Sequence, residues 1–211
     1  MEKKSNPGFI FNKYASNYQD KYMNLELYAD TLDTFIDILK KDDAKILDAG
    51  CGPGNISKYL LDRCPRLKIL GIDISENMIA LARNNNPEAQ FKIMDCRKID
   101  GLSEIYDAVI AGFISSYLNQ KELSDFIKNT AGLLKYEGSL YLSGMDAGGK
   151  DAGHEVSSSD GEDVLFTYYH SIDFLQQTLE KYHFKIQHQF YLKNPNNAEG
   201  INDLVIIANK I

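Results

Sequence analysis

The stretch that most constrains this chain is a glycine turn that follows a short apolar run. The run over residues 45–49 carries Asp48 near its end, and glycines then occupy three alternate positions, Gly50, Gly52 and Gly54. Glycine adopts positive φ freely and lets a ligand approach the backbone, and a helix expected over residues 55–63 would add unpaired N–H groups. The pattern predicts a strand, a tight turn and a helix, with a ligand lying against the main chain.

The apolar pattern alternates between helical and strand-like segments from about residue 25 onward. The expected helices cover residues 25–41, 75–84 and 121–135, and the expected strands cover residues 67–72, 90–94, 106–111, 139–143, 184–192 and 203–209. Such alternation is typical of an α/β fold with a parallel sheet. The last two strands are joined only by residues 193–202, which excludes a helical crossover and predicts an antiparallel pair. Residues 144–163 lack periodicity, and we expect a loop that covers a substrate.

Length and composition exclude several classes of protein. The 211 residues suit a single domain, and no apolar run approaches the ~20 residues of a membrane span or forms the core of a signal peptide. The three cysteines form no CxxC pair, so we expect reduced thiols, no metal site and a cytoplasmic protein. The net charge of −7, without a basic cluster, argues against nucleic acid as a partner.

Two further acids follow predicted strands. Asp73 ends the second strand, 19 residues after Gly54, close to the interval at which an acid meets ribose hydroxyls in nucleotide-binding folds. Asp95 ends the third strand, before Cys96. Open α/β sheets bind ligands at the carboxyl ends of their strands, so these acids are expected in one crevice with the glycine turn. The alternatives are that Asp73 supports an N-cap at Ser75 and that Asp95 is an ordinary turn aspartate.

The turn resembles the first motif of the class I S-adenosylmethionine-dependent methyltransferases, in which an acid ends the strand before G-x-G-x-G. Dinucleotide enzymes have the spacing G-x-G-x-x-G instead. The resemblance implies a Rossmann-like fold: a seven-stranded, mostly parallel sheet with helices on both faces and an antiparallel C-terminal hairpin. It also implies that S-adenosylmethionine is the cofactor and S-adenosylhomocysteine the product.

The same resemblance assigns roles to individual residues. The turn would wrap the methionine part of the cofactor, Asp73 would bind both ribose hydroxyls, and Asp95 with the Cys96 N–H would bind the adenine edge. The cofactor-binding residues expected on this basis are Tyr14, Tyr18, Asp48, Ala49, Gly50, Cys51, Gly52, Asp73, Ile74, Met78, Asp95, Cys96, Ala111, Gly112 and Phe113.

The first 24 residues resemble a segment that folds over the cofactor in many small-molecule methyltransferases. Tyr14 and Tyr18 are four residues apart and would share one helical face, although a plain core stripe has the same spacing. Near the other end, residues 168–175 resemble the lead into the family's last crossover helix. His183 then stands where the family usually has a glycine.

The resulting hypothesis is methyl transfer to a small-molecule acceptor by in-line displacement, with alignment and exclusion of water as the main requirements. An amine acceptor needs no base, whereas a hydroxyl would benefit from one; the candidates for catalytic residues are His154, His170 and Tyr117. Ser116 would also face the substrate. A nicotinamide-dependent oxidoreductase and a non-catalytic S-adenosylmethionine-binding protein are the alternatives. The residues identify neither the acceptor nor the oligomeric state.

Overall fold

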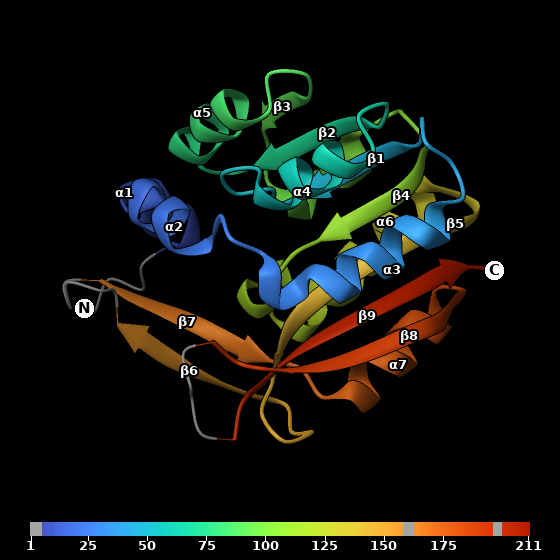
Figure 1. The fold of residues 1–211 in the computed structure, drawn as a ribbon. Helices are drawn as coiled ribbons and strands as arrows, with labels where there is room; N and C mark the ends of the chain where they lie inside the picture. Colours follow the sequence, from blue (N-terminus) through green and yellow to red (C-terminus); the bar gives the residue numbers. More distant parts are fainter. Residues whose placement is uncertain (1–5, 158–162, 196–199) are drawn as a thin grey trace.

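The chain is built around one seven-stranded sheet. The computed structural model describes residues 6–157, 163–195 and 200–211, and the sheet has the strand order β3-β2-β1-β4-β5-β9-β8 (Figure 1). Strands β3, β2, β1, β4 and β5 run parallel, whereas β9 is antiparallel to both β5 and β8. The strands are β1 (Lys45–Ala49), β2 (Lys68–Asp73), β3 (Gln90–Ile93), β4 (Tyr106–Ala111), β5 (Leu134–Asp146), β8 (Phe184–Lys193) and β9 (Asn202–Lys210). The mostly parallel sheet and its C-terminal hairpin are therefore confirmed.

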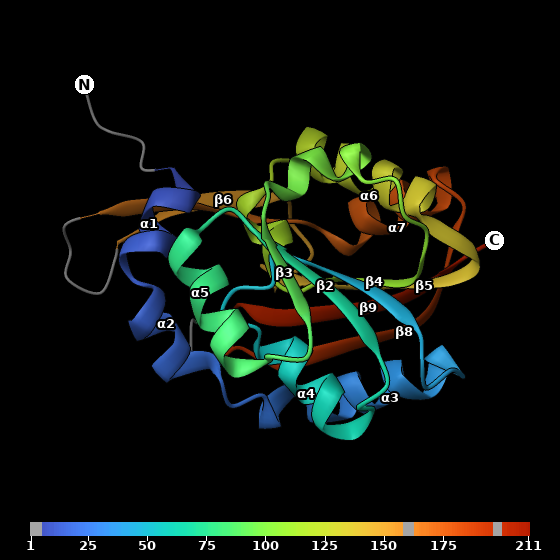
Figure 2. The same cartoon turned by 90° about the horizontal axis from the view of Figure 1, so that it is seen from above.

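Helices cover both faces of this sheet. They are α1 (Pro7–Lys13), α2 (Ala15–Tyr22), α3 (Ala29–Leu39), α4 (Asn55–Arg63), α5 (Glu76–Asn85), α6 (Gln120–Leu133) and α7 (Ile172–Lys181), with 3-10 turns η1 (Glu26–Tyr28), η2 (Cys96–Gly101) and η3 (Ile114–Tyr117). Helices α3 and α4 lie on one face, and α6 and α7 lie on the other (Figure 2). Successive residues of β1 show the two cores: Ile46 packs with Phe35 of α3, and Leu47 packs with Phe126 of α6.

Local signals explain where several helices begin. The Ser75 side chain accepts a hydrogen bond from the Met78 N–H and caps α5, as expected. Asn119 and Glu122 form a reciprocal capping box at the start of α6. Because α5 begins directly after β2 and Asp73, this cap holds the start of α5 at the carboxyl end of β2, where the site lies.

The expectation of a loop over residues 144–163 is wrong in part. Strand β5 continues to Asp146, and β6 (Ala152–Ser157) pairs with β7 (Val164–Tyr169) as a separate antiparallel hairpin. Residues 158–162, at its tip, lie outside the described part of the chain, as do residues 1–5 of the N-terminal segment and residues 196–199 of the link between β8 and β9. Sequence periodicity missed the hairpin because β6, with the sequence Ala-Gly-His-Glu-Val-Ser, has few of the β-branched and aromatic residues typical of strands.

The α7–β8 junction carries a strained residue. His183 has φ 63°, follows the end of α7 and is exposed, so the position that resembles a family glycine does require a left-handed backbone. We expect His183→Gly to raise the free energy of unfolding by about 1 kcal/mol, because L-residues are strained in this region. Urea denaturation measures the change. His188→Gly, at an exposed position of β8, is the control and should destabilise the protein; an unchanged or lower stability of His183→Gly would contradict the account.

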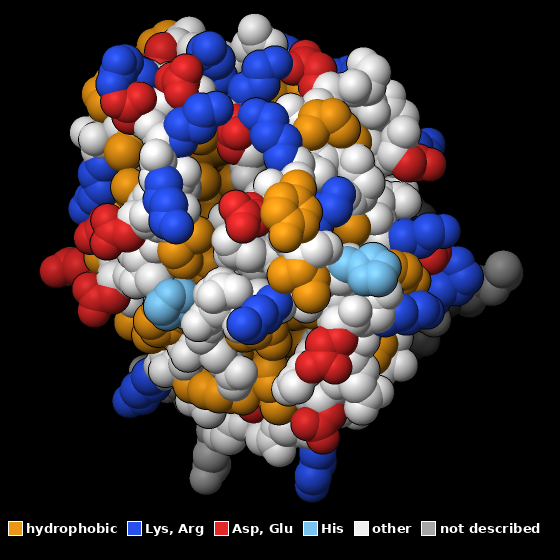
Figure 3. Space-filling model, turned by 90° about the vertical axis from the view of Figure 1, so that its right-hand side faces the viewer, with side chains coloured by type: hydrophobic (Ala, Val, Ile, Leu, Met, Phe, Trp, Pro, Cys, Tyr) orange, Lys and Arg blue, Asp and Glu red, His pale blue; other side chains and the backbone are white. Residues whose placement is uncertain are grey.

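Two further properties concern membrane-spanning helices and the distribution of charge on the surface. No helix in the described part of the chain is long and apolar enough to cross a membrane. On the face shown in Figure 3, acidic and basic side chains are interspersed among polar and apolar ones.

Candidate functional site

The glycine turn lies at the carboxyl end of β1 and has the strained geometry expected of it. Gly50, Gly52 and Gly54 all have positive φ, at 72°, 52° and 78°. The Gly50 and Cys51 N–H groups both donate to the Ile72 carbonyl of β2, at 2.8 and 2.9 Å. A Cβ on Gly50 would lie only 2.0 Å from Ile114 Cγ2, so this position accepts glycine alone.

Asp48 lies beneath the turn and is 1% exposed. Its Oδ2 accepts a hydrogen bond of 2.6 Å from the Ser57 hydroxyl in the first turn of α4. Burial raises the pKa of this carboxyl to about 6, against the opposing effect of the Ser57 hydrogen bond. Asp48 therefore places a largely ionised acid under the turn at neutral pH, without a basic partner in the described part of the chain.

Asp73 ends β2 and joins that strand to the turn. Its Oδ2 accepts from the Gly52 N–H at 3.0 Å, and its Oδ1 accepts from the Ser75 N–H at 2.8 Å. Burial raises the pKa of Asp73, although the backbone N–H groups of Ser75 and Gly52 oppose the shift. Because each carboxylate oxygen has two acceptor sites, both oxygens retain capacity for a ligand hydroxyl.

Asp95 has a closer partner than the sequence indicated. The Arg97 guanidinium contacts both of its oxygens, with Nη2 to Oδ2 at 2.7 Å and Nε to Oδ1 at 3.0 Å, and the Arg97 N–H also donates to Oδ1. Although partial burial opposes it, this pairing lowers the pKa of Asp95. Much of the acceptor capacity predicted to recognise adenine is thus used within the chain.

Two connected pockets open at this edge of the sheet. One, which we call the β2 pocket, has about 790 Å³ of empty space, counted out to its open mouth. It is lined by Asn6, Pro7, Gly8, Phe11, Tyr18, Gly50, Gly52, Asp73, Ile74, Met78, Met94, Asp95, Cys96, Arg97, Gly112, Phe113, Ile114, Tyr117 and Leu118. The pocket brings together ten of the fifteen predicted cofactor-binding residues, from α2, the turn after β1, the end of β2 and the start of α5, and the segments after β3 and β4.

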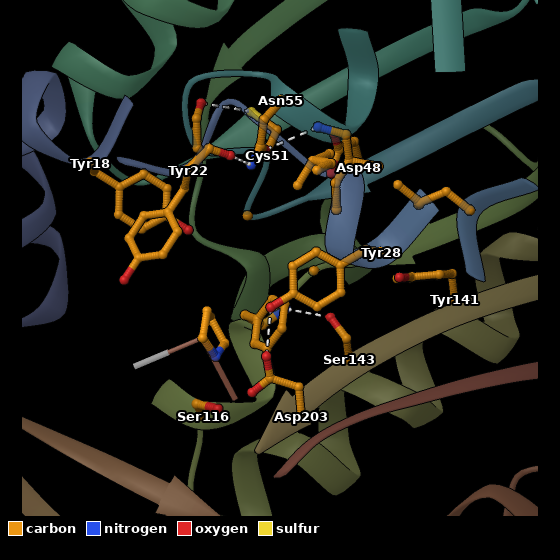
Figure 4. Close-up of a pocket in the computed structure, with 18 of the residues that line it drawn as sticks. Tyr18, Tyr22, Tyr28, Asp48, Cys51, Asn55, Ser116, Tyr141, Ser143 and Asp203 are labelled. Atoms are coloured by element: carbon orange, nitrogen blue, oxygen red, sulfur yellow. Dashed lines mark hydrogen bonds between the residues drawn. The ribbon is translucent and has the colours of Figure 1, made fainter. Parts of the chain in front are cut away.

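The second, which we call the β9 pocket, has about 990 Å³ of empty space on the same measure. It shares Tyr18, Gly50, Gly52, Gly112, Phe113 and Tyr117 with the β2 pocket, so the two meet at the turn. It adds Asp48 and Cys51, two more of the predicted residues, and extends to β5 and β9. Figure 4 shows Asp48 and Asn55 at one end of this pocket, and Tyr28, Ser143 and Asp203 at the other.

The remaining three predicted residues line neither pocket. Ala49 and Ala111 are fully buried at the ends of β1 and β4. Tyr14 breaks the N-terminal helix into α1 and α2, so it does not share one continuous helical face with Tyr18. The Tyr14 hydroxyl instead donates to Asp163, at 3.1 Å, at the start of the β6–β7 hairpin's second strand.

Helices α1 and α2 lie beside α5 (Figure 2), and they contribute Pro7, Gly8, Phe11 and Tyr18 to the wall of the β2 pocket. Asn12 holds α1 to the start of α5: its Oδ1 accepts from the Ser75 hydroxyl and the Asn77 N–H, both at 3.0 Å. The Asn55 side chain donates to the Tyr22 carbonyl at the end of α2. Phe11 meets Tyr117 edge to face, with ring centroids 4.9 Å apart. The described residues of this segment therefore lie beside the β2 pocket, and their role as a cover over a cofactor stays a prediction.

The two histidines proposed as bases do not join the site. His154 lies on the exposed strand β6, stacked on Tyr169 with ring centroids 5.2 Å apart. His170 is 3% exposed and lines only a separate small cavity, and its Nε2 donates to the Ser115 and Leu118 carbonyls. Tyr117, in contrast, lines both pockets, and burial raises the pKa of its phenol.

We expect His170→Ala to destabilise the fold by about 1–3 kcal/mol at pH 7.5, because two buried carbonyls of η3 lose their donor. Burial lowers the pKa of His170, so the wild-type protein loses stability as pH falls below the unfolded value of about 6.5. The alanine variant has no such loss, and its deficit should narrow at pH 5. Urea denaturation at both pH values measures this. A constant deficit, or lost activity at full stability, would contradict the structural role.

Comparison with known proteins gives the class of this site. Residues 46–138, which run from β1 into β5, match the family model described as "Methyltransferase domain". Over these residues the chain therefore carries a methyltransferase domain. The resemblance seen in the glycine turn is therefore confirmed.

Named relatives agree with this assignment of the methyltransferase domain. The chain is 35% identical over 136 residues to a malonyl-[acyl-carrier protein] O-methyltransferase of Acetivibrio thermocellus, covering 63% of this chain and 47% of that protein. It is 46% identical over 52 residues to a trans-aconitate 2-methyltransferase of Variovorax paradoxus, covering 25% and 20%. The chain thus spans half or less of the length of these relatives.

A solved structure supports the fold. A S-adenosylmethionine-dependent methyltransferase of Methanosarcina mazei superposes with a TM-score of 0.70 and 24% identity, over 84% of this chain and 97% of that one. At this identity the likeness concerns the fold of the methyltransferase domain.

Several pocket residues of the methyltransferase domain were missed from sequence. Arg97 is only two residues from Asp95, and that spacing is a usable sign of a local ion pair. Asp203 had a weaker signal, an acid at the start of an otherwise apolar strand. Tyr28 had none, because its partner Asp203 is 175 residues away in the sequence. Asn12, which lines neither pocket but binds Ser75, also had none, because Ser75 is 63 residues away.

Proposed function

We propose that this protein binds S-adenosylmethionine in the β2 pocket and transfers its methyl group to a small molecule held in the β9 pocket. The observation that carries the proposal is that the two pockets meet at the glycine turn, between Gly52, Gly112 and Tyr117. A donor on one side and an acceptor on the other would then be aligned with little further movement. Alignment supplies much of the acceleration in such a displacement.

The residues of the β2 pocket suit this cofactor. The sulfonium, when bound, supplies an activated methyl group. The Asp73 carboxylate has acceptor capacity for two ribose hydroxyls, and Ile74 and Met78 offer an apolar surface for a flat ring. A Cβ on Gly52 would have only the Tyr18 ring within 4 Å, at 3.8 Å, so a ligand can approach the backbone there.

The acceptor is proposed at the level of a small molecule. The relatives' names specify malonyl-[acyl-carrier protein] and trans-aconitate for those proteins, so a protein-linked acceptor is a second candidate. One side of the β9 pocket is formed by α2, the link after it and η1, through Tyr22, Asn24 and Tyr28. These elements leave less room for a carrier protein, which favours a small free acceptor. A cytoplasmic location belongs to the same proposal, supported by three cysteines that are all unpaired.

Calorimetry with S-adenosylhomocysteine, followed by transfer of radiolabelled methyl groups to metabolite fractions, tests the proposal. We expect binding of the product and label in small molecules. Label confined to acyl-carrier protein would favour the second candidate. Stabilisation by NAD but not by S-adenosylmethionine would instead support an oxidoreductase, and binding without turnover of any acceptor would support a non-catalytic protein.

A further inference from the structure

The part of the β9 pocket around Asp203 has a distinct chemical character. Its charged group is this acid, which binds the Tyr28 hydroxyl (Figure 4), and the Tyr28 ring in turn contacts Phe113, a residue that lines both pockets. Among the described residues that line the pocket there is no lysine, arginine or histidine. A ligand that enters this part therefore meets negative charge and ring faces.

Asp203 is held in a fixed position, and burial raises the pKa of its carboxyl against the hydrogen bonds from Tyr28 and Asn194. It is 1% exposed, on β9 opposite Met145 of β5. Its Oδ2 accepts from the Tyr28 hydroxyl at 2.5 Å and its Oδ1 accepts from the Asn194 amide at 2.7 Å. Both donors are neutral, and no lysine or arginine of the described chain forms an ion pair with Asp203. A buried carboxylate of this kind is costly unless a cation joins it.

The surrounding rings also favour a cation. Tyr28 meets Phe113 edge to face at 5.4 Å, and the Phe113 backbone has φ 58°, a strained conformation that places its ring at the junction of the two pockets. Aromatic faces attract ammonium groups through their quadrupole, more strongly where water is excluded. The aromatic rings and the Asp203 carboxylate therefore both favour a bound cation.

A second observation indicates that a hydrogen-bonding ligand belongs here. Ser116 Oγ lies on the pocket wall, is 1% exposed and has no hydrogen-bond partner in the described chain. Buried polar atoms in folded proteins are nearly always paired, and an exception in a pocket marks the place of a missing partner. An N–H group of the ligand would give Ser116 the donor that it lacks.

We propose that the methyl acceptor is an amine, whose ammonium group binds at Asp203 between Tyr28 and Phe113. This inference rests on the proposed function and adds the chemical class of its acceptor. In the transfer, one proton of the ammonium group passes to the Asp203 carboxylate. The nitrogen lone pair then forms the N–C bond to the methyl group, and the C–S bond breaks and leaves its electron pair on sulfur. A carboxylate acceptor would instead meet the unpaired charges of Asp203 and Asp48.

Matched ligands test the class of acceptor. Phenethylamine, 2-phenylethanol and 3-phenylpropionate differ mainly in the terminal group, and each is titrated calorimetrically into the protein saturated with S-adenosylhomocysteine. We expect the amine to bind at least about tenfold more tightly than the alcohol, with the carboxylate weakest. Asp203→Asn keeps the size of the side chain and should lower amine affinity about tenfold, while the alcohol binds as before.

Two controls separate the possible failures. Asp146→Asn changes a buried acid on the neighbouring strand that lines neither pocket, and it should leave amine affinity unchanged. Near-UV circular dichroism confirms that each variant is folded. If the wild-type protein did not bind S-adenosylhomocysteine, the proposed function itself would be overturned. Normal product binding, with amines bound no better than carboxylates or unaffected by Asp203→Asn, would overturn only the amine proposal.

Discussion

Replacing Gly50 with alanine is expected to abolish binding of S-adenosylhomocysteine. The added Cβ would lie 2.0 Å from Ile114 Cγ2, and the residue would keep φ 72°, which L-residues rarely adopt. Relief requires the turn to move away from η3. That movement would break the hydrogen bonds from the Gly50 and Cys51 N–H groups to the Ile72 carbonyl and would shift both pockets at their junction.

The expected loss of affinity is at least about 100-fold, since misplacement by about 1 Å in a preorganised site has effects of this size. Calorimetric titration measures it, with urea denaturation to record the accompanying loss of stability. Gly148→Ala is the matched control: Gly148 has φ 69°, but nothing lies within 4 Å of the added Cβ and the residue lines neither pocket. That variant should show backbone strain alone and bind the product normally. Normal binding by Gly50→Ala would show that the turn does not hold the cofactor.

The parts of the fold that the sequence predicted correctly are those with strong local signals. Helix α4 spans the expected residues, and the glycine turn before it marks its start. The Ser75 cap was recognised because its side chain and the Met78 N–H are three residues apart. The C-terminal hairpin followed from the length of its link alone.

The errors arise where structure depends on distant partners. The β6–β7 hairpin is stabilised by its own pairing, such as His154 opposite Thr167, and β6 lacks an apolar pattern that would reveal it. The break at Tyr14 was also missed, and the Tyr14 hydroxyl donates to Asp163, 149 residues away. Neither contact produces a periodic pattern of apolar residues in the sequence.

The site shows the same division between local and distant information. The turn, Asp73 and the residues after β3 were predicted because a family motif marks them, and the structure places them around one pocket. Asp203 had only a weak signal, since it reaches the β9 pocket through the pairing of β9 with β5. Sequence therefore predicted most of the residues that the β2 pocket brings together, whereas the Asp203 part of the β9 pocket required the fold.

Replacing Asp73 with asparagine is expected to lower the affinity for S-adenosylhomocysteine about 100-fold, because two charge-assisted hydrogen bonds to ribose would be lost. The asparagine has one acceptor oxygen, so it cannot also satisfy both the Gly52 and the Ser75 N–H groups. Since burial raises the pKa of Asp73, the wild-type affinity should decline as pH falls toward that raised value, and the variant should lack this dependence.

Two comparisons distinguish ribose recognition from support of the helix cap. Ser75→Ala removes the acceptor for the Met78 N–H and one of the two donors to Asn12 but keeps the Asp73 carboxylate, so it should reduce stability by about 1 kcal/mol and lower affinity far less than Asp73→Asn does. The wild-type protein should also prefer adenosine to 2′-deoxyadenosine, and Asp73→Asn should not. If Ser75→Ala weakened product binding as much as Asp73→Asn, and neither protein discriminated the two nucleosides, Asp73 would be a capping residue and the ribose would be held elsewhere.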